Sequence, residues 1–140
     1  MERYLCLDLG TKTVGIAISD SLGIVHGKEN YTFSEFYYKL AREHVISVAK
    51  EENIINIVLG LPLQLDRNEG KRCESVRRFA SDLKNEYPEA NIFFMDESFS
   101  TIEARERLKT QGLKENKIKP IIDMMSAVVI LEDYLKTINK

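Results

Sequence analysis

Two apolar runs near the N-terminus constrain the fold more than any other feature of this sequence. Residues 3–9 (RYLCLDL) and residues 14–19 (VGIAIS) are almost continuously apolar, and only the four residues GTKT separate them. Runs of this length are typical of buried strands, and so short a connection joins antiparallel neighbours. Residues 24–32 are expected to add a third strand after a turn at residues 20–23. The chain is therefore predicted to begin with three antiparallel strands.

The remaining sequence alternates between helical and strand patterns. Apolar residues recur at helical spacing in four segments, 34–52, 69–87, 100–108 and 120–138. Ser34, and either Ser100 or Thr101, are the expected N-caps of the first and third helices, and Pro120 is expected in the first turn of the last. Short apolar runs predict strands over residues 54–59 and 91–95.

Strands that alternate with helices usually pair in parallel. We therefore expect an α/β fold with a mixed five-stranded sheet, antiparallel over its first three strands and parallel beyond them, flanked by helices. This order of elements resembles the ribonuclease H-like architecture. With 140 residues, of which 44% are hydrophobic, the chain is expected to form a single domain over residues 1–140.

Charge and residue usage exclude several classes of protein. The two cysteines, Cys6 and Cys73, have neither the number nor the spacing of a disulfide scaffold or a structural zinc site. No apolar run approaches the ~18 residues of a membrane span, and the N-terminus lacks a signal sequence, so we expect a cytoplasmic protein without a membrane partner. The net charge of −2 means that nucleic-acid binding must come from local basic surfaces.

Asp8 is the residue that most strongly indicates chemistry. It interrupts the first apolar run, and an ionised carboxylate in an apolar strand is unfavourable unless it is paired or bound to a cation. Gly10 follows closely and leaves room for a ligand. A turn-forming aspartate that accepts backbone N–H groups is the alternative interpretation.

Three further acidic residues are candidates to join Asp8. Asp96 and Glu97 follow the predicted strand 91–95, and because successive side chains alternate faces, at most one of them points towards Asp8. Asp123 begins the last helix, where small residues on the same face allow close approach to the sheet. Carboxylates gathered in this way favour a pair of Mg²⁺ or Mn²⁺ ions, as used in phosphoryl transfer. Asp96 as a turn residue and Asp123 as a helix-dipole acid are the alternatives.

Basic residues form two local groups that a phosphate backbone could follow. The first lies between residues 67 and 84 and contains Arg67, Lys71, Arg72, Arg77, Arg78 and Lys84. The second lies between residues 103 and 119, where Arg105 is one of six basic residues against three acidic ones. Charged helix faces exposed to solvent are the alternative interpretation of both groups.

Five ordered motifs make the chain similar to the YqgF (RuvX) family of nucleases from about Tyr4 to Leu135. These motifs are LDLGTKTVGIA at residues 7–17, Ser19-Asp20, GLPL at residues 60–63 with Gly70 and VRRFA at 76–80, Asp96-Glu97 with Ser100-Thr101 and Ala104, and Ile122-Asp123 leading to Ala127 and Ile130-Leu131.

The resemblance implies a ribonuclease H-like fold and a metal-dependent endonuclease that matures the 5′ end of the 16S ribosomal RNA precursor. It places the catalytic and metal-binding acids at Asp8, Glu97 and Asp123, with Asp96 as an alternative ligand. Lys12 corresponds to a basic position in the first hairpin that meets phosphate. Arg72, Arg77 and Arg105 are the other expected nucleic-acid contacts. Ser98 replaces the arginine usual in the family, which removes a bidentate phosphate contact.

Three other functions are compatible with the sequence. A resolvase for four-way DNA junctions would need a dimer to cut two symmetric strands. Residues 8–11 (DLGT) also resemble the first phosphate loop of actin-like and sugar-kinase ATPases, although those proteins need two such domains. A non-catalytic RNA-binding factor for ribosome assembly is the third. For the nuclease we expect structured RNA or branched DNA as the partner, the ribosome as a further partner, and a monomer or weak homodimer.

Overall fold

The computed structural model describes residues 1–63 and 70–139, which contain five strands and five helices. The strands are β1 (Tyr4–Leu9), β2 (Thr13–Ser19), β3 (Val25–Thr32), β4 (Asn56–Leu61) and β5 (Asn91–Asp96). The helices are α1 (Tyr38–Glu51), α2 (Lys71–Glu86), α3 (Ser100–Thr110), α4 (Glu115–Ile118) and α5 (Ile122–Ile138). No helix in these ranges combines the length and apolarity needed to cross a membrane.

The strands form one mixed sheet in the order β3-β2-β1-β4-β5. β2 pairs antiparallel with both β1 and β3, whereas β4 pairs in parallel with β1 and β5. This arrangement confirms the predicted five-stranded sheet. Because β1, β4 and β5 run in the same direction, they finish at one end of the sheet, at Leu9, Leu61 and Asp96. We call this the carboxyl end, and the opposite end, where these strands begin, the amino end.

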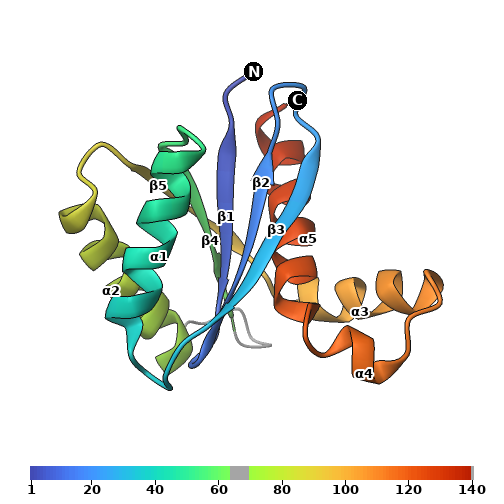
Figure 1. The fold of residues 1–140 in the computed structure, drawn as a ribbon. Coiled ribbons are helices and arrows are strands. Elements are labelled where there is room, and N and C mark those ends of the chain that lie inside the picture. Colours follow the sequence, from blue (N-terminus) through green and yellow to red (C-terminus); the bar gives the residue numbers. More distant parts are fainter. Residues whose placement is uncertain (64–69, 140) are drawn as a thin grey trace.

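Helices cover both faces of the sheet, with α1 and α2 on one face and α5 on the other (Figure 1). Successive side chains of β1 alternate between the two cores, as a strand requires. Leu5, Leu7 and Leu9 pack with residues of α1 and α2, while Tyr4 and Cys6 pack with residues of α5. By the same alternation Asp8 lies on the α5 face.

The predicted N-caps are wrong for both helices. α1 begins at Tyr38, four residues after Ser34, because residues 34–37 form a separate turn in which the carbonyl of Ser34 accepts the amide of Tyr37. α3 begins at Ser100 itself, and its hydroxyl donates to the carbonyl of Glu97 instead of capping the helix. Neither helix has a side-chain cap at its N-terminus.

The chain between α3 and α5 also differs from the prediction. α3 extends to Thr110, and Gly112 follows it with a φ of 88°, the left-handed conformation typical of a helix end. The short helix α4 was not predicted, and Pro120 lies between α4 and α5 instead of in the first turn of α5. The predicted start of the second helix at Glu69, and Arg67, lie outside the described residues.

Candidate active site

Strand alternation decides which acidic residue of the Asp96-Glu97 pair joins Asp8. Phe93 and Met95 pack into the core beneath α5, whereas Phe94 packs into the opposite core. Asp96 is paired with Leu61, whose side chain also belongs to the core beneath α1 and α2. Glu97 continues the alternation onto the α5 face, and its amide donates to the carbonyl of Leu61 at 3.1 Å. Glu97 and Asp8 therefore share one face of the sheet.

Gly60 gives the Glu97 side chain its path to Asp8. Since β4 lies between β1 and β5, the Glu97 carboxylate must reach across it, and neighbouring strands are ~4.8 Å apart. A Cβ atom at position 60 would lie 2.6 Å from Glu97 Oε2 and 2.9 Å from Ile130 Cδ1. Only a residue without a side chain leaves this space open.

The carboxyl groups of Asp8 and Glu97 are joined by a hydrogen bond. Burial raises the pKa of both groups, and for Asp8 the Glu97 charge and this hydrogen bond raise it further, well above the usual range. The contact with Asp8 lowers the pKa of Glu97, but burial outweighs it and the pKa of Glu97 is still raised. The positive charge of the Arg72 guanidinium lowers both pKa values, but by less than burial raises them.

Asp123 is held beside this pair by the start of α5. Its Oδ2 accepts a hydrogen bond of 2.5 Å from Thr13 Oγ1, and its charge raises the pKa values of Asp8 and Glu97. The backbone of α5 rests directly on β2, because a Cβ atom at Gly15 would lie 2.0 Å from the Asp123 carbonyl oxygen. The amide of Met124 donates to Asn30 Oδ1 at 2.9 Å, which ties the same turn to β3.

The three carboxylates offer only oxygen atoms, the donors that Mg²⁺ and Mn²⁺ prefer. Two of them are in direct contact, and the third is engaged by Thr13. Within residues 1–63 and 70–139, no three His, Cys, Asp or Glu side chains are already gathered closely enough to hold a metal ion. The donor set therefore fits a hard cation in chemical type.

Asp96 has a different environment from the other acids. Its Oδ1 accepts the Ser98 amide at 2.9 Å and the Ser98 hydroxyl at 2.5 Å. This is the arrangement of a turn residue before a helix, which was the alternative interpretation of Asp96. Ser98 therefore contributes to the turn that leads into α3.

The four basic residues expected to contact nucleic acid lie in separate surroundings. Lys12 is exposed in the turn between β1 and β2. Arg72 donates to the Leu9 carbonyl at 2.7 Å and to the Tyr38 hydroxyl at 3.3 Å, close to the acidic pair. The Arg77 guanidinium lies 4.8 Å from the centre of the Phe94 ring, and Arg105 forms an ion pair with Glu115 of α4. Only Lys12 and Arg72 belong to segments that adjoin Asp8.

Sequence reasoning missed three residues that build the site, Thr13, Gly15 and Gly60. All three lie inside the motifs that carried the family resemblance, but the motifs alone do not tell what each residue does. A glycine within a predicted strand often marks a close approach of another chain segment. That signal was available for Gly15 and Gly60, whereas nothing in the sequence pairs Thr13 with Asp123.

Known proteins resemble this chain along nearly its whole length. A family model described as "RuvX: Holliday junction resolvase" matches residues 2–137. A protein of Ureaplasma parvum is 42% identical over 140 residues and one of Halalkalibacterium halodurans is 39% identical over 134 residues, each match covering 95% of both chains. Both relatives bear the name "Putative pre-16S rRNA nuclease".

Among solved structures, Thermus thermophilus RuvC in complex with a Holliday junction substrate matches this fold with a TM-score of 0.60. The match covers 98% of this chain and 96% of that one at 11% sequence identity, so it concerns the fold alone. It confirms the ribonuclease H-like architecture. Together with the match over residues 2–137, it leads to one conclusion: this chain belongs to the RuvX family.

Proposed function

We propose that this chain is a single-domain, divalent-metal-dependent endonuclease that processes the 5′ end of the 16S ribosomal RNA precursor in the cytoplasm. The observation that carries the proposal is the hydrogen-bonded pair of buried carboxyl groups, Asp8 and Glu97, with Asp123 adjacent, at the carboxyl end of the sheet. Like charges held together in this way are unfavourable for folding alone, and acid-only sites of this type serve phosphoryl transfer.

Asp8, Glu97 and Asp123 would hold the metal, a pair of Mg²⁺ or Mn²⁺ ions. Bound ions would activate water and stabilise the leaving oxygen of the phosphodiester, leaving a 5′-phosphate. The residues of the chain prepare this site in three ways. Asp8 and Glu97 lie together and must both be ionised to act as ligands, Thr13 holds the Asp123 carboxylate beside them, and exposed Lys12 offers a cation to the substrate phosphate.

Structured precursor RNA, bound on the assembling ribosome, is the substrate we favour. Its support is the name shared by the relatives at 39% and 42% identity, which match along nearly their whole length. A four-way DNA junction is the second candidate, because the family model carries the description of a resolvase. Cutting two symmetric strands of a junction would require two copies of this chain.

The test is cleavage of labelled 16S precursor RNA and of a synthetic four-way DNA junction, side by side, with Mg²⁺ or Mn²⁺. We expect cutting of the RNA, and a loss of at least ~1,000-fold in rate in Asp8→Asn, as for removal of a principal catalytic group. Asp20→Asn is the matched control, because Asp20 lies at the amino end of the sheet and bonds to His26 there.

Three results would change the proposal. Symmetric cutting of the junction alone would assign the resolvase function. Full activity of Asp8→Asn would show that the site lies elsewhere. Failure to cut either substrate, together with binding of precursor RNA, would favour a non-catalytic assembly factor.

A further inference from the structure

An exposed aromatic segment lies against the turn that follows Asp8. Phe36 is 62% exposed and Tyr37 is 58% exposed, in the connection between β3 and α1. The Phe36 amide donates to the Thr11 carbonyl at 2.7 Å, and the Phe33 amide donates to the Lys12 carbonyl at 2.9 Å. Figure 1 shows this connection beside the carboxyl end of β1. These two bonds hold the backbone of Phe36 against the turn that begins two residues after Asp8.

The backbone conformation of Phe36 is unfavourable for a phenylalanine. Its φ is 63°, in the left-handed region that bulky side chains rarely adopt. Its ring makes an edge contact with Tyr38 at a centroid distance of 6.5 Å and is otherwise largely open to solvent. Packing against the first turn of α1 does not explain it, because the residue in staple position is the small, buried Ala41. An exposed ring in a strained turn indicates a role outside folding.

Basic side chains accompany this ring. Lys12 is exposed in the adjoining turn, and no other described residue forms a hydrogen bond or ion pair with its side chain. Tyr38, which contacts the Phe36 ring, accepts a hydrogen bond from Arg72, and Arg72 also donates to the Leu9 carbonyl. A line of contacts thus leads from Phe36 to the residue next to Asp8. Proteins bind single-stranded nucleic acid with this combination, because bases stack on the ring while phosphates meet the cations.

Phe99 is a further exposed aromatic residue near the acids, with 66% of its surface exposed. It lines a hollow together with Asp96, Glu97, Glu103 and Asp133. Apart from Glu97, which would hold the metal, three further carboxylates make this hollow acidic, whereas exposed Lys12 lies in the turn beside Phe36 and attracts phosphate. The charge distribution therefore favours Phe36 over Phe99 as a contact for nucleic acid.

We infer that Phe36 is a stacking platform for an unpaired base of the substrate, next to the phosphate that lies at Asp8 and Glu97. The inference rests on the proposed nuclease function and deepens it, because it specifies the substrate at the cleavage point as single-stranded. A base within a duplex is already stacked on both faces and cannot engage the ring. The enzyme would then act on unpaired nucleotides and bind duplex RNA more weakly.

Binding to a fluorescent probe tests this inference without cleavage. The probe is a single-stranded RNA of about ten nucleotides that contains 2-aminopurine, whose fluorescence is quenched by stacking. In an Asp8→Asn background, we expect Phe36→Ala to raise the Kd about tenfold and to remove the quenching, while Phe36→Tyr keeps both. Leu22→Ala is the matched control, because Leu22 is equally apolar, 77% exposed, and lies at the amino end of the sheet. Phe99→Ala should leave the Kd within about twofold.

Phe36→Gly separates stacking from folding. Glycine adopts a positive φ without strain, so this variant should unfold at the same temperature or higher and still lose the quenching. Unchanged Kd and quenching in Phe36→Ala, or an equal loss of affinity for the duplex form of the probe, would overturn the inference. If the wild-type chain cuts no substrate, the proposed nuclease fails, yet the quenching experiment still decides whether Phe36 stacks on a base.

Discussion

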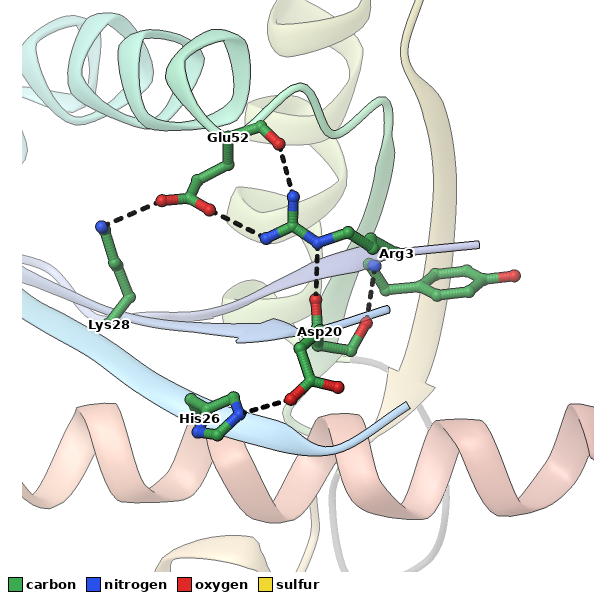
Figure 2. Close-up of polar contacts among 7 residues, drawn as sticks. Arg3, Asp20, His26, Lys28 and Glu52 are labelled. Atoms are coloured by element: carbon green, nitrogen blue, oxygen red, sulfur yellow. Dashed lines mark hydrogen bonds and ion pairs between the residues drawn. The ribbon is translucent and has the colours of Figure 1, made fainter. Parts of the chain in front are cut away.

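At the amino end of the sheet Arg3 lies between acidic and carbonyl oxygens, whereas at the carboxyl end Asp8 and Glu97 lie against each other. Arg3 donates to the Glu52 carboxylate at 2.8 Å, to the Glu52 carbonyl at 2.6 Å and to the Ser19 carbonyl at 3.1 Å (Figure 2). Lys28 donates to the second oxygen of the Glu52 carboxylate at 3.1 Å. Opposite charges therefore tie β1, β3 and the end of α1 together.

The pKa values of the carboxyl groups move in opposite directions at the two ends. Hydrogen bonds from Arg3 and Lys28 lower the pKa of Glu52, and the hydrogen bond with His26 lowers that of Asp20. Burial raises the pKa values of Asp8 and Glu97. Ionisation of Glu52 and Asp20 at the amino end therefore stabilises the fold, whereas ionisation of Asp8 and Glu97 at the carboxyl end destabilises it. An unfavourable arrangement of this kind is tolerated where it serves a function.

Gly15→Ala should have the largest effect on stability, because it pushes α5 away from the acidic end. The new Cβ would lie 2.0 Å from the Asp123 carbonyl oxygen, so helix or strand must move, at a cost of roughly 3 kcal/mol. Urea unfolding followed by circular dichroism measures this change. Gly27→Ala is the control, since the atoms nearest to its Cβ would belong to the flexible side chain of Met124, at 3.0 Å. Equal stability of the two variants would contradict this packing.

Arg3→Ala should cost less, about 2 kcal/mol, because it removes charge-assisted hydrogen bonds from a partly buried guanidinium. Cleavage should keep its wild-type rate, since the acidic pair lies at the opposite end of the sheet. Thermal unfolding and the RNA cleavage assay are measured on the same preparation. Lys28→Ala, which removes one exposed contact, should be milder. A loss of cleavage in folded Arg3→Ala would show that the two ends are coupled.

Asp8→Asn should raise stability at neutral pH while abolishing cleavage. A raised pKa means that folding favours the protonated carboxyl, so the wild type loses stability as pH rises from about 4, where the unfolded chain ionises, through the pKa of the folded state. Asparagine does not titrate and avoids this loss, for a gain of about 1 kcal/mol near pH 7. The difference should shrink towards zero in acid. Unfolding midpoints measured from pH 4 to 8 test it, and a variant less stable than the wild type at pH 7 would contradict the repulsion.

The number of strands and their mixed pairing could be predicted from sequence because strand and helix periods differ clearly in this chain. Residues 3–9 and 14–19 are too apolar and too close together for anything but paired strands, and β1 and β2 lie there. The helix starts could not be predicted in the same way. Ser34 and Ser100 have the right chemistry for N-caps, but a tertiary hydrogen bond from Phe36 to Thr11 and a local bond from Ser100 to Glu97 determine the chain direction instead.

The candidate site, too, could be predicted from the sequence only in part. Strand alternation predicted that only one of Asp96 and Glu97 points towards Asp8, but choosing between them required knowing which core each β5 residue enters. Gly60 matters because the Glu97 side chain crosses β4, and this depends on the strand order β1-β4-β5. The assignment of Asp8, Glu97 and Asp123 as metal ligands remains a prediction.

Asp20→Asn should have the smallest effect, since its carboxylate is exposed and screened by solvent. The lowered pKa of Asp20 arises from the hydrogen bond with His26, 2.8 Å from Oδ2, and from the Ile24 and Leu22 amides, which donate to Oδ1. A lowered pKa contributes stability above the pKa of the unfolded chain, and this contribution is lost as pH falls through the pKa of the folded state. Asp20→Asn should therefore be slightly less stable than the wild type at neutral pH and equal to it in acid, the reverse of Asp8→Asn. Carboxyl titration by NMR, with Asp20 below and Asp8 above the ordinary range, is the direct measurement. If the pKa values of Asp20 and Asp8 were shifted in the same direction, the contrast between the two ends of the sheet would be contradicted.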